Sequence, residues 1–108
     1  MRVFIACHLI ALLLSTHSFK SHTGDYKTHM GEWNEKRILA SQYLLKAEKA
    51  LKAGDKAKGC INQLKASKYG IEATQSLKEA IRLNGTAQGL EVVESQQRRW
   101  KALVELCN

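Results

Sequence analysis

Apolar residues recur at intervals of three and four along most of the chain, which is the spacing of one face of an α-helix. The first such stripe contains Ala40, Leu44, Ala47 and Leu51, and similar stripes continue to the C-terminus. The predicted helices cover residues 32–53, 56–69, 72–83 and 87–107. No segment has the alternating pattern of a strand, so we expect an all-α fold.

Glycines separate these stripes and predict where each helix ends. Gly54 and Gly70 follow the first and second stripes, and Asn84-Gly85 follows the third. Asp55 is placed to cap the second helix, because its side chain can accept a hydrogen bond from the free N–H groups of the first turn. Connections of one to three residues favour antiparallel neighbours. We therefore expect a small bundle of about four antiparallel helices.

The N-terminus has the three parts of a secretory signal peptide in their usual order. Met1-Arg2 is a short positive segment, Val3–Leu14 is largely apolar, and Thr16 and Ser18 are small residues at the −3 and −1 positions of a cleavage site. The apolar run is shorter than the roughly 20 residues that cross a bilayer. We expect residues 1–18 to be removed and the protein to be periplasmic or secreted. The alternatives are an uncleaved anchor and an amphipathic terminal helix.

Residues 19–31 mix glycine, histidine, serine and threonine without an apolar period, which predicts a flexible arm ahead of a helical bundle domain at 32–108. Four side chains of types that bind zinc or copper lie in or beside this arm: His22, Asp25, His29 and Glu32. Because no rigid element fixes their spacing, a solvated arm is the favoured interpretation. We expect no metal and no cofactor.

The chain is basic, with 17 Lys+Arg against 10 Asp+Glu and a formal net charge of +7. The leader contributes only Arg2, so the mature chain keeps 16 against 10. A positive balance favours anionic partners, such as a membrane surface, an acidic protein or nucleic acid. For an exported protein, nucleic acid is the least favoured of these.

The basic side chains gather in two places. The first group surrounds the expected turn between the first two helices and comprises Lys46, Lys49, Lys52, Lys56, Lys58, Lys65 and Lys68. The second group lies on the last helix and comprises Arg98, Arg99 and Lys101, beside Trp100. Together they predict binding to a partner or to an anionic surface, with Trp100 at a lipid interface. The alternative is that both groups are solvated helix faces and Trp100 belongs to the core.

Cys60 and Cys107 are the cysteines that remain after leader removal, because Cys7 lies within the leader. An even number of cysteines in a small exported domain predicts a disulfide. Linking them closes a loop of about 47 residues, which by loop-closure entropy stabilises the fold by roughly 4 kcal/mol. The alternative is two buried free thiols, since cysteine is among the most buried residue types.

Two predicted helices meet at Gly54-Asp55, and aromatic and small residues follow a regular order around that turn. These residues are Tyr43 and Ala47 on the first helix, and Gly59 and Ala66 on the second. In this order, residues 40–67 resemble a single tetratricopeptide repeat. The resemblance implies a helical hairpin packed through small residues and a concave surface for a peptide partner. The alternative is a plain helical hairpin with glycine-aspartate turn chemistry.

No arrangement of residues predicts an enzyme. A catalytic nucleophile needs a base beside it, and the histidines that follow the leader, His22 and His29, lie in the arm. We expect a small basic helical protein that binds a protein partner of unknown identity, in the cell envelope or outside the cell, as an adaptor, accessory or inhibitor. The alternatives are a toxin or killing factor that acts on membranes and an immunity-type protein that neutralises such a toxin.

The leader and the disulfide can be tested together by the intact mass of the protein from its native compartment. We expect the mass of a chain that begins near residue 19, with two cysteines that alkylate only after reduction. A full-length chain with free thiols would contradict both expectations.

Overall fold

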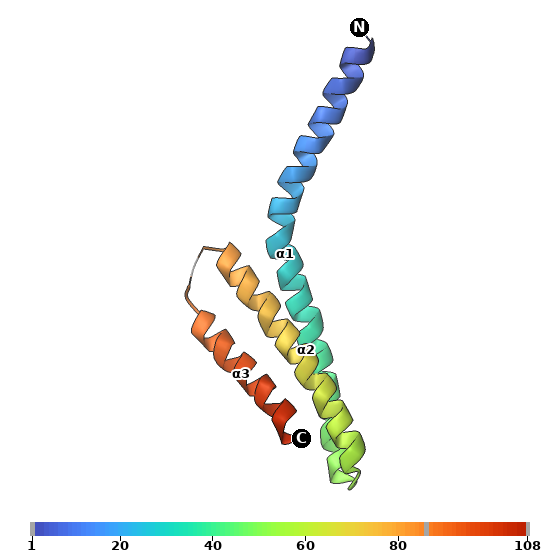
Figure 1. The fold of residues 1–108 in the computed structure, drawn as a ribbon, viewed down its shortest axis with the longest axis vertical. Coiled ribbons are helices and arrows are strands. Elements are labelled where there is room, and N and C mark those ends of the chain that lie inside the picture. Colours follow the sequence, from blue (N-terminus) through green and yellow to red (C-terminus); the bar gives the residue numbers. More distant parts are fainter. Residues whose placement is uncertain (1, 86, 108) are drawn as a thin grey trace.

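The computed structural model describes residues 25–85 and 87–107, and within them the fold is all-α, as predicted (Figure 1). Its helices are α1 (Arg2–Lys52), α2 (Lys56–Leu83) and α3 (Leu90–Leu106). The predicted signal peptide and the first part of the predicted arm lie outside the described residues.

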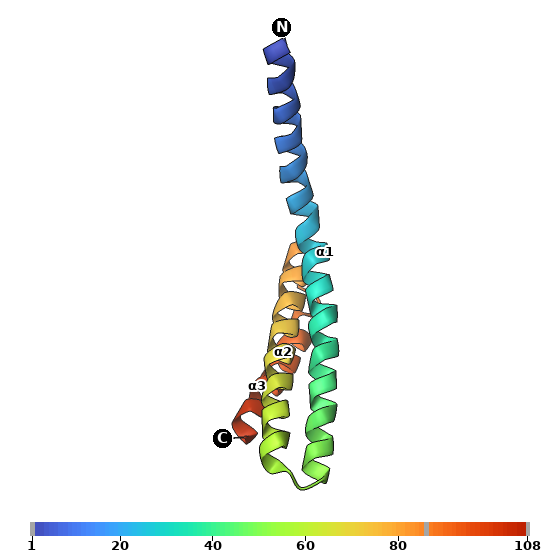
Figure 2. The same ribbon diagram turned by 90° about the vertical axis from the view of Figure 1, so that its right-hand side faces the viewer.

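The three helices are arranged with α2 in the middle (Figures 1 and 2). A turn at residues 53–55 joins α1 to α2 as an antiparallel hairpin, and α3 runs back along another side of α2. The backbone of α2 approaches both neighbours closely, whereas the described part of α1 has no such approach to α3. One side of α2 is therefore left open between its two neighbours.

The prediction of four helices is wrong, because the second and third predicted helices are one continuous helix, α2. Gly70 was expected to end a helix, but it lies in the interior of α2 and has no positive φ. A Cβ atom at this position would overlap the indole ring of Trp100 on α3. Glycine is therefore needed at residue 70 because it has no side chain, and its freedom to make a turn is not used.

The structure also corrects the start of the first helix, since residues 25–31 are already helical ahead of the expected start at Glu32. The reason is the length of α2, which spans 28 residues and needs a partner along its last turns. There the Ser76 hydroxyl donates a hydrogen bond of 3.1 Å to Glu32 Oε2, and Lys36 Nζ lies 3.7 Å from Glu72 Oε2. A continuous α2 thus extends the surface on which α1 packs.

The turn chemistry is as predicted at the other glycines. Gly54 has a φ of +83°, and Asp55 Oδ1 accepts a hydrogen bond of 3.0 Å from the backbone N–H of Lys58 in the first turn of α2. Gly85 also has a positive φ, at +75°, just beyond the end of α2. These residues separate the helices because few other residue types adopt this conformation at low cost.

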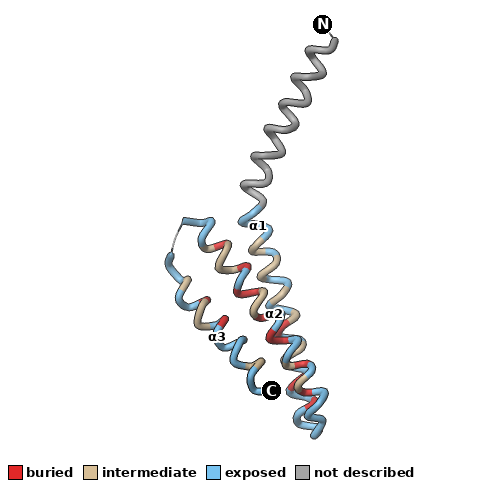
Figure 3. The backbone as a smooth tube through the Cα atoms, in the orientation of Figure 1, coloured by how far each residue is buried: buried red, intermediate tan, exposed pale blue. Residues whose placement is uncertain are grey.

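Buried positions lie along the sides of α1 and α2 that face each other (Figure 3), and small residues occupy them. The fully or nearly fully buried apolar residues of this interface are Ala40, Ala47, Ala50, Ala66, Ala73 and Ala80. Ser67 and Thr74 are buried as well, and their hydroxyls donate to the carbonyls of Gln63 and Gly70, so no polar group is left unpaired there. Alanine buries little apolar area, so close helix packing contributes more to this interface than hydrophobic bulk.

The contact between Gly70 and Trp100 predicts an unusual result for Gly70→Ala. Alanine normally stabilises a helix interior by about 1 kcal/mol relative to glycine. Here the added methyl group would displace the indole, and overpacking of this kind costs about 1–3 kcal/mol. We expect a net loss in the free energy of unfolding, measured by urea denaturation of the protein.

Gly31→Ala is the matched control, because an added Cβ meets nothing within 4 Å at this helical position. We expect it to raise the free energy of unfolding by about 0.4–1 kcal/mol. Equal stabilisation by both substitutions would show that Trp100 does not pack on Gly70 in solution.

Candidate functional site

A groove lies over α2 where α1 and α3 stand apart, with a volume of about 540 Å³. α1 contributes Trp33, Arg37, Ser41 and Leu44, α2 contributes Gly70, Ala73 and Thr74, and α3 contributes Gln96, Arg99, Trp100 and Leu103. We call it the Trp–Arg groove. Its volume is within the range of about 300–1,000 Å³ that is usual for ligand pockets.

The floor of the Trp–Arg groove is made of small α2 residues. Ala73 and Thr74 are almost completely buried, and Gly70 lies directly beneath the indole of Trp100. A larger residue at any of these positions would fill the hollow that the separation of α1 and α3 leaves. The same small residues therefore allow the helices to approach and keep the groove open.

The rim of the Trp–Arg groove is positively charged. The Arg37 guanidinium lies 5.0 Å from the ring centroid of Trp33 and donates a hydrogen bond of 2.6 Å to Asn34 Oδ1. Arg99, on the facing helix, makes no ion pair with a described residue. None of the lining residues is acidic. The groove thus offers apolar aromatic surface beside two cations without a carboxylate to neutralise them.

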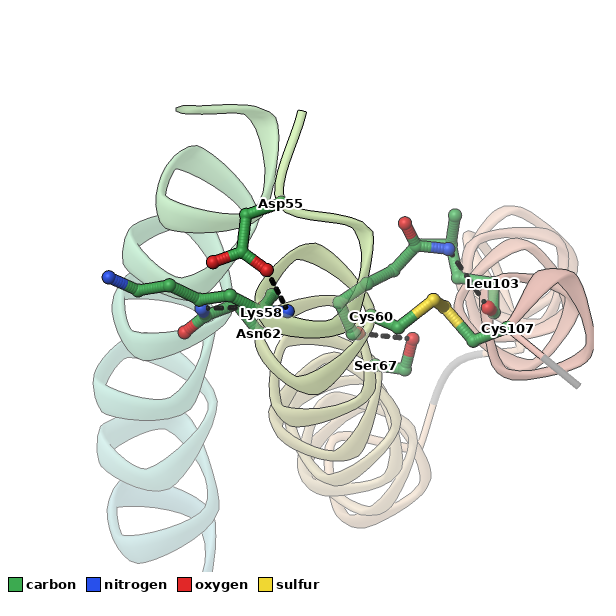
Figure 4. Close-up of a disulfide and its surroundings, with 8 residues drawn as sticks. Asp55, Lys58, Cys60, Asn62, Ser67, Leu103 and Cys107 are labelled. Atoms are coloured by element: carbon green, nitrogen blue, oxygen red, sulfur yellow. Dashed lines mark hydrogen bonds between the residues drawn. A yellow bond between two sulfur atoms is a disulfide. The ribbon is translucent and has the colours of Figure 1, made fainter. Parts of the chain in front are cut away.

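A disulfide and several hydrogen bonds hold α3 beside α2 (Figure 4). Cys60 and Cys107 are linked, as predicted, with their Cα atoms 5.6 Å apart. Gln63 Nε2 donates a hydrogen bond of 3.1 Å to the carbonyl of Leu103 in the same region. At mid-helix, the buried Gln97 side chain lies 3.5 Å from the Ile71 carbonyl oxygen and 3.4 Å from Gln75 Oε1. The last turns of α3, which form one wall of the groove, are therefore fixed covalently.

A second hollow, of about 610 Å³, lies near the turn between α1 and α2. Its lining comprises Tyr43, Lys46, Lys49, Ala50, Ala53, Asp55, Lys58, Asn62 and Lys65. We call it the lysine hollow. It shares no lining residue with the Trp–Arg groove, so the two occupy separate surfaces of the molecule.

The basic residues singled out from sequence are divided between these surfaces. Arg99 and Trp100 line the Trp–Arg groove, and Lys46, Lys49 and Lys58 line the lysine hollow. The remaining predicted basic residues line neither the Trp–Arg groove nor the lysine hollow. Three of them are exposed elsewhere: Lys52, Lys56 and Arg98. Lys101 borders a shallow depression with Lys36 and Glu72. Trp100 is only partly buried, so it both packs on Gly70 and borders the groove.

Trp33 and Arg37 are not among the site residues predicted from the sequence. Trp33, Arg37, Ser41 and Leu44 follow one another at spacings of four and three, which places them on one helix face. That spacing was a usable signal. What it does not reveal is that this face meets Arg99 and Trp100, 55 or more positions later in the chain.

The potential metal ligands of the arm do not come together in the part of the chain that the structure describes, where no group of three such residues lies within reach of one ion. Glu32 instead accepts the hydrogen bond from Ser76, and its carboxylate lies 3.8 Å from His29 Nδ1. Asp25 is exposed, and His22 lies outside the described residues.

Comparison with known proteins does not place the chain in a family: no family model, no curated protein and no solved structure matches it. Among the described residues, no helix combines the length and the apolar character that crossing a membrane requires. Functional inference therefore depends on the geometry of the two surfaces described above.

The covalent link predicts that reduction releases α3 before it unfolds the hairpin. Among the described residues, the backbone of α3 approaches α2 closely and does not approach α1. The disulfide closes a loop of 47 residues, so loss of this link costs roughly 4 kcal/mol of stability. In hydrogen exchange of the protein, we expect the amides of α3 to exchange at least tenfold faster after reduction, with a smaller effect at residues 40–73. An equal acceleration in all three helices would instead show that the chain unfolds as one unit.

Proposed function

We propose that the mature chain is an exported binding module that holds a segment of a partner protein in the Trp–Arg groove. The observation that carries this proposal is the groove's composition: two tryptophans and two arginines around a floor of small residues, without a carboxylate. Tryptophan and arginine are the residues most enriched where interfaces concentrate their binding energy. Charge complementarity favours a segment that carries acidic side chains beside apolar ones.

Binding is favoured over catalysis by the groups that the groove contains. Its two hydroxyls belong to Ser41 and Thr74, and both donate to carbonyls one turn earlier, at Arg37 and Gly70. No histidine, aspartate or glutamate lines the groove to act as a general base. We therefore propose no enzymatic activity.

Export is supported by two independent features. Residues 1–18 have the pattern of a signal peptide, and the Cys60–Cys107 link suits an oxidising compartment such as the periplasm or the extracellular space. An adaptor, an accessory subunit and an inhibitor all require a surface of this kind. The resemblance of residues 40–67 to a tetratricopeptide repeat, a family that binds peptides, stays a prediction in keeping with this role.

The partner can be sought with the mature, disulfide-bonded protein as bait in an envelope or extracellular extract. We expect a stoichiometric partner whose recovery falls at least tenfold with Arg37→Glu/Arg99→Glu, because the substitution reverses both charges at the rim. The recovery is measured by quantitative mass spectrometry of the retained proteins.

Lys52→Glu/Arg98→Glu is the matched control, since it makes the same change of charge at exposed residues outside the groove. A photoreactive side chain at Gln96, on the rim, should cross-link to the same partner, whereas one at the exposed Glu105 should not. Recovery that both charge reversals abolish equally would contradict the proposal.

The membrane-acting toxin is the alternative, and dye release from anionic vesicles at low salt distinguishes it. A binding module leaves the vesicles intact, whereas a membrane-disrupting protein releases the dye. An immunity-type protein would be recognised by the identity of the captured partner, which would then itself be a toxin.

A further inference from the structure

The lysine hollow concentrates positive charge that the protein does not neutralise. It is lined by Lys46, Lys49, Lys58 and Lys65. None of their ammonium groups forms an ion pair with a carboxylate among the described residues. Its one acidic residue, Asp55, is committed to capping α2 through the Lys58 N–H. Like charges held together in this way repel one another, so the arrangement costs stability in the absence of an anion.

A pair of stacked tyrosines restricts the positions of two of these lysine side chains. Tyr43 on α1 and Tyr69 on α2 have ring centroids 5.6 Å apart and planes within 11° of each other. The ammonium groups of Lys46 and Lys65, one from each helix, lie 4.9 and 5.5 Å from the centroid of the Tyr43 ring. Cation–π attraction restricts where these two charges lie before any ligand arrives. The site therefore exists only when the hairpin is folded.

The floor of the lysine hollow is made of buried residues. Ala50 and Asn62 are buried, and Asn62 Nδ2 donates a hydrogen bond of 2.9 Å to the Lys58 carbonyl. These residues belong to the closely packed part of the α1–α2 interface, whereas Lys49 and Lys58 above them are exposed. Exposed ammonium groups on flexible side chains, above a floor of buried residues, suit an anion that presents several oxygen atoms in different directions.

We propose that the lysine hollow binds a ligand that carries two phosphate groups on one scaffold. Four lysines and one aspartate leave three positive charges in the hollow, and each phosphate monoester carries about −1.5 to −2 at neutral pH. One phosphate leaves positive charge unneutralised, and two balance it. The hollow, at about 610 Å³, has room for both groups and the scaffold between them.

The phosphates could belong to a soluble molecule or to a lipid headgroup, and the chemistry that recognises them is the same. This site uses none of the residues of the Trp–Arg groove, so its test is independent of the proposed function. Loss of one activity need not affect the other.

The soluble source is tested by calorimetric titration of the mature protein with fructose 1,6-bisphosphate and with fructose 6-phosphate, which differ by one phosphate. At low ionic strength we expect the bisphosphate to bind at least tenfold more tightly. Its affinity should rise between pH 5.5 and 7.5, because the phosphates lose their second proton near pH 6 and so gain negative charge. Added salt should weaken it by screening.

The lipid source is tested in parallel with phosphatidylcholine vesicles that contain either diphosphoryl or monophosphoryl lipid A. A preference for the diphosphoryl form, read by vesicle co-sedimentation, would identify a headgroup as the ligand. A preference for fructose 1,6-bisphosphate over fructose 6-phosphate would identify a soluble bisphosphate.

The variant Lys49→Gln/Lys58→Gln removes two charges from exposed positions in the hollow, and we expect it to weaken bisphosphate binding about tenfold. Lys27→Gln/Lys101→Gln removes two charges from exposed positions outside it and should change binding less than twofold. Thermal melts show whether each variant is folded. The proposal is overturned if neither pair of ligands shows a preference for two phosphates, or if Lys49→Gln/Lys58→Gln changes bisphosphate binding less than twofold.

Discussion

The packing of the Trp100 indole on Gly70 is the contact on which most of this structure depends. It requires α2 to pass through residue 70 without a side chain, and it brings the C-terminal helix against the middle of the hairpin. The disulfide and the Gln63 hydrogen bond then fix the end of α3 on the same helix. Because α3 is held by α2 and not by α1, the space between α1 and α3 stays open as the Trp–Arg groove.

Small residues at helix interfaces have two consequences for function in this chain. They let α1 and α2 pack closely with little hydrophobic bulk, so large apolar side chains such as Leu45 and Ile61 remain exposed. A thin core of this kind benefits from a covalent link, which a chain in an oxidising compartment can form. The groove floor and the α1–α2 interface share Ala73 and Thr74, so the stability of the hairpin and the shape of the groove are coupled.

The positive charge of the chain is not spread evenly, and its two concentrations differ in chemistry. The Trp–Arg groove joins planar guanidinium groups to aromatic surface, a combination suited to acidic and apolar protein segments. The lysine hollow offers four separate ammonium groups, two of them beside the Tyr43 ring, which suits an anion with several oxygen atoms. A basic composition alone does not separate these two surfaces, whereas the fold places them on different parts of the molecule.

Local chemistry in the sequence was enough to determine the helical class, the turn at Gly54-Asp55 with its cap, and the pairing of Cys60 with Cys107. These features follow from helical periodicity, from conformations that few residues other than glycine adopt, and from the number of cysteines. Only the tertiary structure decided that α2 continues through Gly70 and that Trp33 and Arg37 face Arg99 and Trp100. A glycine that ends a helix and one that admits a neighbouring ring are identical in sequence. They differ only in what approaches them from another part of the chain.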